Sequence, residues 1–320
     1  MVRHTGSQQL SSLPSLLRRC IHDRDLIQGE HLHSLLSTQR RLDQHPVLCK
    51  LLIELYHKCG CPHKSMDLFY SISHRQDPVL WNSIISLQSR LGHYHASLQV
   101  YTQMMIEGVF PSKVTFVCIF PICAKMKCSE EGRRVHVRVL ASDFLSDVVV
   151  GTAILNMYGR CENIEHARMV FNHMPSHDVV AWNAIITLYA QLGKGIEAIE
   201  LFASMLLNDD VMPDSVTFVG ILNACANEDV STCGMLIHHL IVESIEIVDV
   251  AVETALVHMY GKCDAFDDAS SVFIRIHQRN VVSFNTMLSV CKHRSEQERV
   301  ELFQKMLYEG VLPDHISFIT

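Results

Sequence analysis

The sequence predicts an all-α protein, a right-handed α–α superhelix in which helix–turn–helix repeats stack into a solenoid. Three observations indicate this fold class. The heptapeptides IELYHKC (53–59), LNMYGRC (155–161) and VHMYGKC (257–263) recur every 102 residues, apolar residues recur at helical spacing, and prolines separate the pieces. Self-similarity at a fixed period is typical of stacked repeats, whose neighbours bury faces that one repeat cannot cover alone.

Each piece carries two apolar stripes. The first follows the spacing i, i+3, i+4, as in Trp182, Ile185 and Ile186, and the second follows a break such as LGKG. This spacing places the apolar residues on one face of a helix, so each piece is expected to be two helices joined by a turn. Three tyrosines of the recurring heptapeptides are expected to fill the seam between adjacent hairpins: Tyr56, Tyr158 and Tyr260.

Prolines mark where one hairpin passes to the next. Pro111, Pro213 and Pro313 each precede a residue type that often begins a helix. A proline fixes φ, and a short polar side chain can accept from the first free backbone N–H groups, so a tight connection is expected there. The residues that follow these prolines are Ser112, Asp214 and Asp314.

Composition excludes several classes of protein. Of 320 residues, 27 are basic and 34 acidic, giving a net charge of −7, whereas a protein that grips nucleic acid only through phosphates is basic. No run approaches the roughly 18 apolar residues that a membrane span needs, so no membrane partner is expected. With no apolar secretory core at the N-terminus, the twelve cysteines are interpreted as reduced thiols.

No catalytic, cofactor or metal site emerges from the motifs. H-E-x-x-H, G-x-S-x-G and Walker sequences are absent. Six of the twelve cysteines follow the repeat, as do His33, His136 and His238. The stretch GKGIEA (193–198) matches a loose dinucleotide fingerprint, but a helix precedes it where that loop needs a strand. The sequence therefore predicts a protein that is not an enzyme and that uses no cofactor or metal.

A polar residue recurs at one place in the first helix, one step after the first residue of the apolar stripe. Asparagine stands there in the longer hairpins and threonine in the shorter ones. An exposed residue near a helix start with no task is one interpretation. The other is a row of polar groups along one surface of the superhelix, about one for each hairpin. The residues are Asn82, Thr152, Asn183, Thr254 and Asn285.

The chain resembles the pentatricopeptide repeat proteins of plant organelles, specifically the subclass that alternates standard, long and short repeats. VVAWNAIITLYAQLG…PD is similar to the standard repeat, VTFVGILNACA…GMLIHH to the long repeat, and TALVHMYGKC…A…VF to the short repeat. The resemblance covers about residues 10–320. Successive lengths of 36, 35 and 31 differ from the constant 34 of a tetratricopeptide array, whose helical pairs are otherwise similar.

The resemblance divides the chain into repeats. Since the sequence ends six residues into a further long repeat, the natural protein is expected to continue. The expected order is a short N-terminal segment (1–9), a degenerate long repeat (10–44), a short repeat (45–77), a standard repeat (78–112), a long repeat (113–147), a short repeat (148–178), a standard repeat (179–214), a long repeat (215–249), a short repeat (250–280), a standard repeat (281–314) and the truncated start of a long repeat (315–320).

The resemblance implies binding of single-stranded RNA, with one base read by the fifth and last residues of each repeat. Amide, hydroxyl and carboxylate groups at these places can bond to a base edge. The implied pairs are Asn82 with Ser112 for cytosine, Thr152 with Asp178 for guanine, Asn183 with Asp214 for uracil, Thr254 with Asn280 for adenine, and Asn285 with Asp314 for uracil.

If the chain runs parallel to the RNA, the implied target is 5′-C-x-G-U-x-A-U-3′, where x faces a long repeat. The long repeats pair a valine with an aspartate and receive no base. Two earlier repeats depart from the pattern and also receive none, and Pro14 is expected to interrupt the first helix of the chain. The unassigned pairs are Pro14 with Gln44, Lys50 with Asp77, Val117 with Asp147, and Val219 with Asp249.

The resulting functional prediction is a site-recognition factor for cytidine-to-uridine editing of organellar RNA, with the deaminase supplied downstream or by an editing-complex protein in trans. Splicing, processing or stabilisation of a transcript is one alternative, and a scaffold for protein interactions is another. Arg3, Arg18 and Arg19 lie among serines before the first acidic residue, which weakly resembles a transit peptide. A mitochondrial or chloroplast location is expected, with the mitochondrion preferred.

Overall fold

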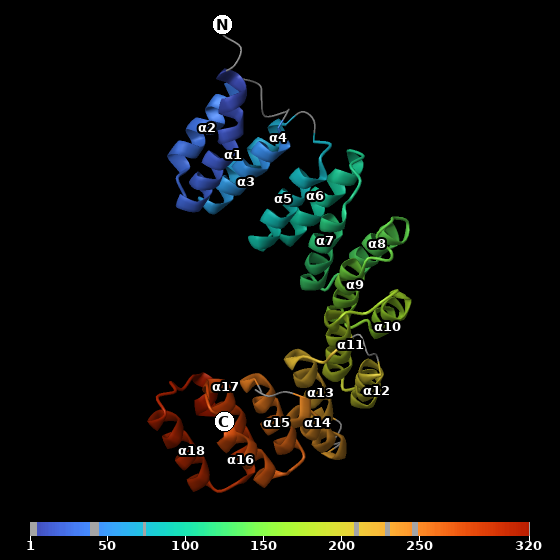
Figure 1. Cartoon of the computed structure of the whole chain (residues 1–320), viewed down its shortest axis with the longest axis vertical. Coiled ribbons are helices and arrows are strands. Elements are labelled where there is room, and N and C mark those ends of the chain that lie inside the picture. The colour runs from blue at the N-terminus through green and yellow to red at the C-terminus, as the bar shows by residue number, and fades with distance from the viewer. Residues whose placement is uncertain are drawn as a thin grey trace. The chain divides into compact units, whose positions relative to one another are not determined.

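A computed structural model describes residues 5–38, 45–72, 75–207, 211–227, 231–244 and 249–319. Every regular element within these ranges is a helix, which confirms the predicted all-α class (Figure 1). The chain divides into two compact units, residues 1–161 and 162–320, which are described separately below as unit 1 and unit 2.

Unit 1 contains four consecutive helical pairs followed by the first helix of another. Odd-numbered helices pack against the next odd-numbered helix, and each even-numbered helix packs against both flanking odd-numbered ones. The helices are α1 (Thr5–Asp23), α2 (Leu26–Thr38), α3 (Pro46–Lys58), α4 (Pro62–Ser71), α5 (Pro78–Arg90), α6 (Tyr94–Ile106), α7 (Lys113–Lys125), α8 (Ser129–Leu140) and α9 (Val148–Arg160).

Unit 2 repeats the same arrangement, with α11, α13, α15, α17 and α19 in one row. Figure 1 shows its helices from yellow-green α10 to red α18. They are α10 (Ile164–His173), α11 (Val179–Gln191), α12 (Gly195–Leu206), α13 (Ser215–Asn227), α14 (Ser231–Ser244), α15 (Val250–Lys262), α16 (Phe266–Arg275), α17 (Val281–Val290), a 3₁₀ turn η2 (Cys291–His293), α18 (Glu296–Tyr308) and α19 (His315–Ile319).

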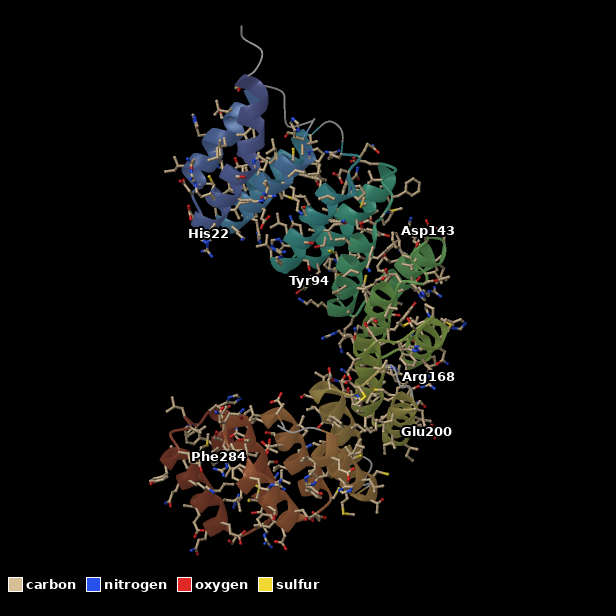
Figure 2. All side chains as sticks on the ribbon, viewed as in Figure 1. His22, Tyr94, Asp143, Arg168, Glu200 and Phe284 are labelled. Carbon is tan, nitrogen blue, oxygen red and sulfur yellow. The ribbon has the colours of Figure 1, made fainter. Side chains whose placement is uncertain are left out.

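The predicted stripes form the core. Ile185 and Ile186 are fully buried, as is Phe284, which Figure 2 labels in unit 2. Residues at helical spacing share one face. The Phe284 ring meets Phe273 of the preceding α16 edge to face, with the ring centres 5.2 Å apart. Burying a side chain of this size contributes about 1.5–3 kcal/mol, so the stripes hold each row together.

A short polar residue caps almost every first helix. Asp77, Asp147 and Asp178 each accept from a backbone N–H of the first turn, and Ser112 and Asn280 do so within capping boxes. The cap satisfies an N–H group that has no carbonyl partner inside the helix. The predicted helix entry at Ser112, after Pro111, is therefore confirmed.

The recurring tyrosines fill the predicted seam and also bond across it. The hydroxyl of Tyr56 on α3 lies 2.6 Å from Nδ1 of His33 on the preceding α2. Tyr158 and His136 are 3.1 Å apart and Tyr260 and His238 2.9 Å, with the same edge-to-face ring geometry. These three contacts tie the second helix of one pair to the first helix of the next pair.

Stability is expected to fall in mild acid because burial lowers the pKa of His33 and His238. Burial, aided by Arg275, lowers the pKa of His238 below the usual 6.5. The unfolded chain therefore takes up a proton more readily, so this stabilisation is complete above about pH 6.5 and is lost as the pH falls through the folded-state pKa. Replacing His238 with glutamine should flatten the pH dependence of urea midpoints between pH 7.5 and 5.5.

His173, an exposed histidine on α10 of the same unit, supplies the matched control for this measurement. Its Nδ1 lies 2.7 Å from the carbonyl oxygen of Met169 on its own helix. His173→Gln should leave the pH dependence of the midpoint unchanged. Equal flattening in both variants would assign the effect to overall charge instead of the buried pair.

The expected interruption at Pro14 is wrong. Helix α1 runs from Thr5 to Asp23 with Pro14 inside it. A proline removes one backbone hydrogen bond, but packing can outweigh that loss. Leu17 and Cys20 of α1 are buried, and α1 packs along α3, which keeps the helix continuous.

Candidate functional site

The five predicted reader residues occupy one register, the fifth position after the N-cap of a first helix. They are less exposed than a surface row would be: Asn82 and Thr152 are each 7% exposed, and Asn183 and Asn285 each 8%. Thr254 is half-buried. Each asparagine therefore offers only an edge of its amide, because the next first helix packs close beside it.

The predicted partner residues are helix N-caps that follow the readers by about one repeat of sequence. The side chains of Asp178 and Asn280 accept from Ala181 N (2.8 Å) and Ser283 N (3.0 Å). Those of Asp214 and Asp314 accept from Thr217 N (2.9 Å) and Ser317 N (3.0 Å). A cap must sit where a helix starts, so helix formation itself fixes these side chains.

Three of the five pairs are joined by hydrogen bonds. Nδ2 of Asn82 donates to Ser112 Oγ at 3.2 Å. Nδ2 of Asn183 donates to Asp214 Oδ1 at 2.9 Å, and the amide of Asn285 donates to Asp314 Oδ1 at 3.0 Å. In each of these pairs, the fifth residue of a repeat is bonded to the last residue of that repeat, which is the N-cap of the next first helix.

The two threonine pairs behave differently. Thr254 donates its hydroxyl to the carbonyl of Val250 on its own helix (2.7 Å), so its proton is directed to the backbone. The hydroxyl oxygen of Thr152 is buried and has no hydrogen-bond partner among the described residues. Thr152 lies in unit 1 and Asp178 in unit 2, and their pairing remains a prediction.

A third residue, which the sequence did not single out, completes the asparagine pairs. The hydroxyl of Thr217, a fully buried residue, lies 2.5 Å from Asn183 Oδ1. The hydroxyl of Ser317 lies 2.6 Å from Asn285 Oδ1. Both residues stand three positions after the cap, where a hydroxyl also accepts from the cap backbone N–H.

These networks keep the cap carboxylates ionised. Burial alone would raise the pKa of Asp214, but hydrogen bonds from the backbone and hydroxyl of Thr217 and from Asn183 outweigh it and lower the pKa. The backbone bond from Ser317 and the amide of Asn285 lower the pKa of Asp314. At neutral pH both groups are therefore hydrogen-bond acceptors only.

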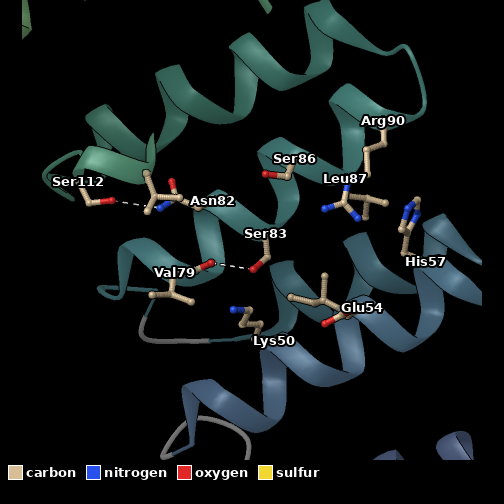
Figure 3. A pocket seen from close by; sticks show the side chains of 12 residues that line it. Lys50, Glu54, His57, Val79, Asn82, Ser83, Ser86, Leu87, Arg90 and Ser112 are labelled. Carbon is tan, nitrogen blue, oxygen red and sulfur yellow. Dashed lines mark hydrogen bonds between the residues drawn. The ribbon is translucent and has the colours of Figure 1, made fainter. Parts of the chain in front are cut away.

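A pocket of about 400 Å³ opens over the Asn82 pair, between α3 and α5 and the start of α7. Figure 3 shows Asn82 bonded to Ser112 at one end, with Arg90 and His57 at the other. Val79 and Val114 line the walls, and Lys50 reaches in from α3. The pocket combines apolar side chains, a polar pair and cations with one carboxylate, that of Glu54. Such a lining suits a planar group with a polar edge.

A corresponding pocket of about 770 Å³ lies over Asn285 in unit 2. Val282 and Ile316 line it beside the asparagine and Asp314. Cations line this pocket too, and the Arg294 guanidinium lies 4.2 Å from the centre of the Phe266 ring. The remaining cations of the lining are Lys262 and Lys292.

The aliphatic residues that line the two pockets, Val79, Val114, Val282 and Ile316, belong to a regular series. The series is present in the sequence but was not predicted to be functional. The second residue of nearly every first helix is a branched aliphatic side chain between 43% and 59% exposed. Large apolar residues half open to solvent at a fixed register point to a contact surface. The series is Val47, Val79, Val114, Val149, Val180, Val216, Val282 and Ile316.

No group of three or more metal-binding side chains occurs among the residues that the structure describes, and no helix there combines the length and apolarity that a membrane span requires. Burial raises the pKa of the Cys123 and Cys225 thiols to about 12, so neither is a ready nucleophile at neutral pH.

Comparison with known proteins identifies the repeats. The model of the PPR repeat family matches residues 177–227, and the PPR repeat model matches 79–109, 152–179 and 254–281. The Arabidopsis thaliana pentatricopeptide repeat-containing protein At4g33990 is 33% identical over 96% of this chain and 37% of its own length. The chloroplastic protein CRR2 of the same plant is 31% identical over 87% of this chain and 43% of its own.

A third Arabidopsis relative, the mitochondrial protein At4g32430, is 30% identical over 97% of this chain and 40% of its own length. The chain thus spans less than half of these relatives. The crystal structure of PPR10 in complex with an 18-nt psaJ RNA element matches 91% of this chain and 44% of PPR10, with a TM-score of 0.73 at 15% identity. The chain belongs to the pentatricopeptide repeat family.

Proposed function

We propose that this chain binds single-stranded RNA and reads about one base for each repeat. The observation that carries the proposal is the asparagine bonded to a helix cap in the lining of a pocket that also has aliphatic side chains, seen at Asn82 and again at Asn285. A base can lie against such aliphatic side chains and bond to the asparagine along its pairing edge. The fold shared with RNA-bound PPR10 supports this assignment.

The base assignments rest on the same pairs. The proposed readers are Asn82 with Ser112 for cytosine, Thr152 with Asp178 for guanine, Asn183 with Asp214 for uracil, Thr254 with Asn280 for adenine and Asn285 with Asp314 for uracil. Arg90 and Lys262, which line the pockets, are proposed to face the phosphates. With a net charge of −7, binding should depend only modestly on salt.

The test is direct. Titrating the protein with an RNA that contains 5′-CNGUNAU-3′, and with a copy in which the C, G and A positions are exchanged, should show binding at least tenfold weaker for the copy, since one good base contact is worth about 1–3 kcal/mol. Asn82→Ala should weaken binding to the first RNA. Asn172→Ala, an exposed asparagine on the second helix α10, is the matched control and should leave binding unchanged.

Equal affinity for the two RNAs would remove the base-reading claim. Binding of neither RNA, combined with capture of a folded protein partner, would favour the scaffold function instead.

We further propose that the chain belongs to the subclass with alternating standard, long and short repeats and directs cytidine-to-uridine editing in an organelle. The deaminase would then come from another part of the natural protein or from an editing-complex partner. The chloroplastic and mitochondrial names of relatives support an organellar location. Sequencing organellar transcripts without the protein should reveal one lost conversion near the target, whereas an unspliced or unstable transcript would indicate processing.

A further inference from the structure

We infer that a buried hydroxyl three residues after an aspartate cap keeps the reader asparagine from accepting a hydrogen bond from a base. Thr217 and Ser317 occupy the amide oxygen of their readers, whereas the amide oxygen of Asn82 has no partner. The hydroxyl would thereby help a reader to distinguish uracil from cytosine. This inference rests on the proposed function, and Thr217 and Ser317 act in it as positioning residues.

The orientation of the Asn183 amide follows from its neighbours. Because ionised Asp214 can only accept, the NH₂ group must face it and the carbonyl oxygen must turn towards Thr217. Asp214 Oδ1 already accepts the Asn183 amide (2.9 Å) and Thr217 N (2.9 Å). The single proton of the Thr217 hydroxyl therefore goes to Asn183 Oδ1 at 2.5 Å, in preference to Asp214 Oδ1 at 3.0 Å.

The same hydroxyl position is used differently at Asn82. Thr115 stands three residues after the cap Ser112, and its Oγ1 lies 3.2 Å from Ser112 Oγ. A serine hydroxyl can both donate and accept, so the two hydroxyls bond to each other. Asn82 Oδ1 then remains buried without a partner, in a residue that is 7% exposed and lines the pocket.

An asparagine with its amide oxygen engaged suits a base edge that accepts, and an asparagine with a free amide oxygen suits a base edge that donates. Asn183 has its oxygen engaged and one N–H left, which can donate to a carbonyl oxygen of uracil. Asn82 keeps a free acceptor, and leaving a buried acceptor unsatisfied is costly, so a ligand that donates to it is favoured. The exocyclic amino group of cytosine is such a donor, whereas uracil has a carbonyl oxygen in its place.

The same chemistry appears where the sequence repeats. Ser317 is 5% exposed and lies 2.6 Å from Asn285 Oδ1, while Asp314 Oδ1 accepts both the Asn285 amide and Ser317 N. Threonine and serine thus make the same contact in two repeats about 100 residues apart. The contact requires a hydroxyl together with an aspartate cap, and not one particular side chain.

The test measures base preference in the whole chain carrying Thr217→Val, with Thr217→Ser as the matched control. RNAs with uracil or cytosine at the fourth position of 5′-CNGUNAU-3′ are compared by titration. The valine variant should lose about tenfold of its preference for uracil over cytosine, because Asn183 Oδ1 becomes free to accept. The serine variant should keep the preference, and preference at the seventh position, read by Asn285, should stay the same in both.

A purely structural role would give a different pattern. Thr217→Val also removes the hydrogen bond from Asp214 N to the Thr217 hydroxyl (3.1 Å). If this were its only effect, the substitution would lower stability and weaken the binding of both RNAs equally, and the ratio of their two affinities would not change. An unchanged ratio in the valine variant would therefore overturn the inference. If the unaltered chain shows no preference at the fourth position, the proposed function itself fails. Should Thr217→Val not fold, Ser317→Ala applies the same comparison at the seventh position.

Discussion

Replacing Trp81 with alanine will lower the free energy of unfolding of unit 1 by about 3–5 kcal/mol, the usual cost of removing a large buried aromatic side chain. Trp81 is fully buried, and its ring meets Phe69 of α4 edge to face at 4.9 Å. Its Nε1 donates to the carbonyl of Arg75 at 2.6 Å, which ties the linker before α5 to the core. Urea unfolding followed by circular dichroism measures the loss.

The two tryptophans of the chain provide an internal comparison. Trp182 occupies the equivalent place on α11 and is 6% exposed, but its Nε1 is buried without a partner among the described residues. Trp81→Phe leaves the Arg75 carbonyl without its donor, whereas Trp182→Phe removes an unpaired N–H group. The first substitution should therefore cost about 1–3 kcal/mol more than the second. Equal costs would mean that the Arg75 bond adds nothing to stability.

Replacing Asp214 with serine will change the preferred base at the fourth position from uracil to cytosine, by about 10- to 100-fold in the ratio of affinities. The substitution reproduces the Asn82–Ser112 pair in another repeat. It removes the carboxylate that accepts from the Asn183 amide and supplies a hydroxyl that can both donate and accept. Serine is also a good N-cap, so stability should change by only a few tenths of a kcal/mol.

The reciprocal variant, Ser112→Asp, is the control for this exchange. It should move the first position from cytosine towards uracil while leaving the fourth position unchanged. Asp249→Ala, which removes the cap of a pair that receives no base, should reduce stability by about 1 kcal/mol and leave both preferences in place. A lower affinity for every RNA, with no change in base preference, would show that the cap residues act only through the fold.

Much of the fold could be predicted from the sequence because it depends on local patterns. Apolar spacing predicts one buried face for each helix, and the 102-residue period shows that neighbouring hairpins cover one another. The seam tyrosines were predictable for the same reason. Helix α1 was not, since packing of Leu17 and Cys20 carries the helix past Pro14, and such tertiary support has no local signal.

The candidate site was predicted only in part. The family resemblance implies five pairs, and hydrogen bonds join three of them in the structure. The amide of Asn183 is held at both ends and is 8% exposed, which depends on how closely α13 packs beside α11. In the sequence, Thr217 has the pattern of an ordinary buried helix residue. Its contact with Asn183 depends on the cap of α13 and the preceding α11 being side by side in the fold. The exposed valines did carry a signal, because each stands two residues after a cap.

Placing the second member of each pair at a helix N-cap limits how a chain of this kind can be redirected to other targets. Asparagine, aspartate, serine and threonine can replace one another there at little cost, while other residues cost about 1 kcal/mol each in helix stability. Eight such caps occur along the described chain, so several unfavourable exchanges together would approach the whole stability of a typical domain. Only a few residue types can therefore be used at these N-caps when a chain of this kind is engineered to bind another target. The eight are Asp77, Ser112, Asp147, Asp178, Asp214, Asp249, Asn280 and Asp314.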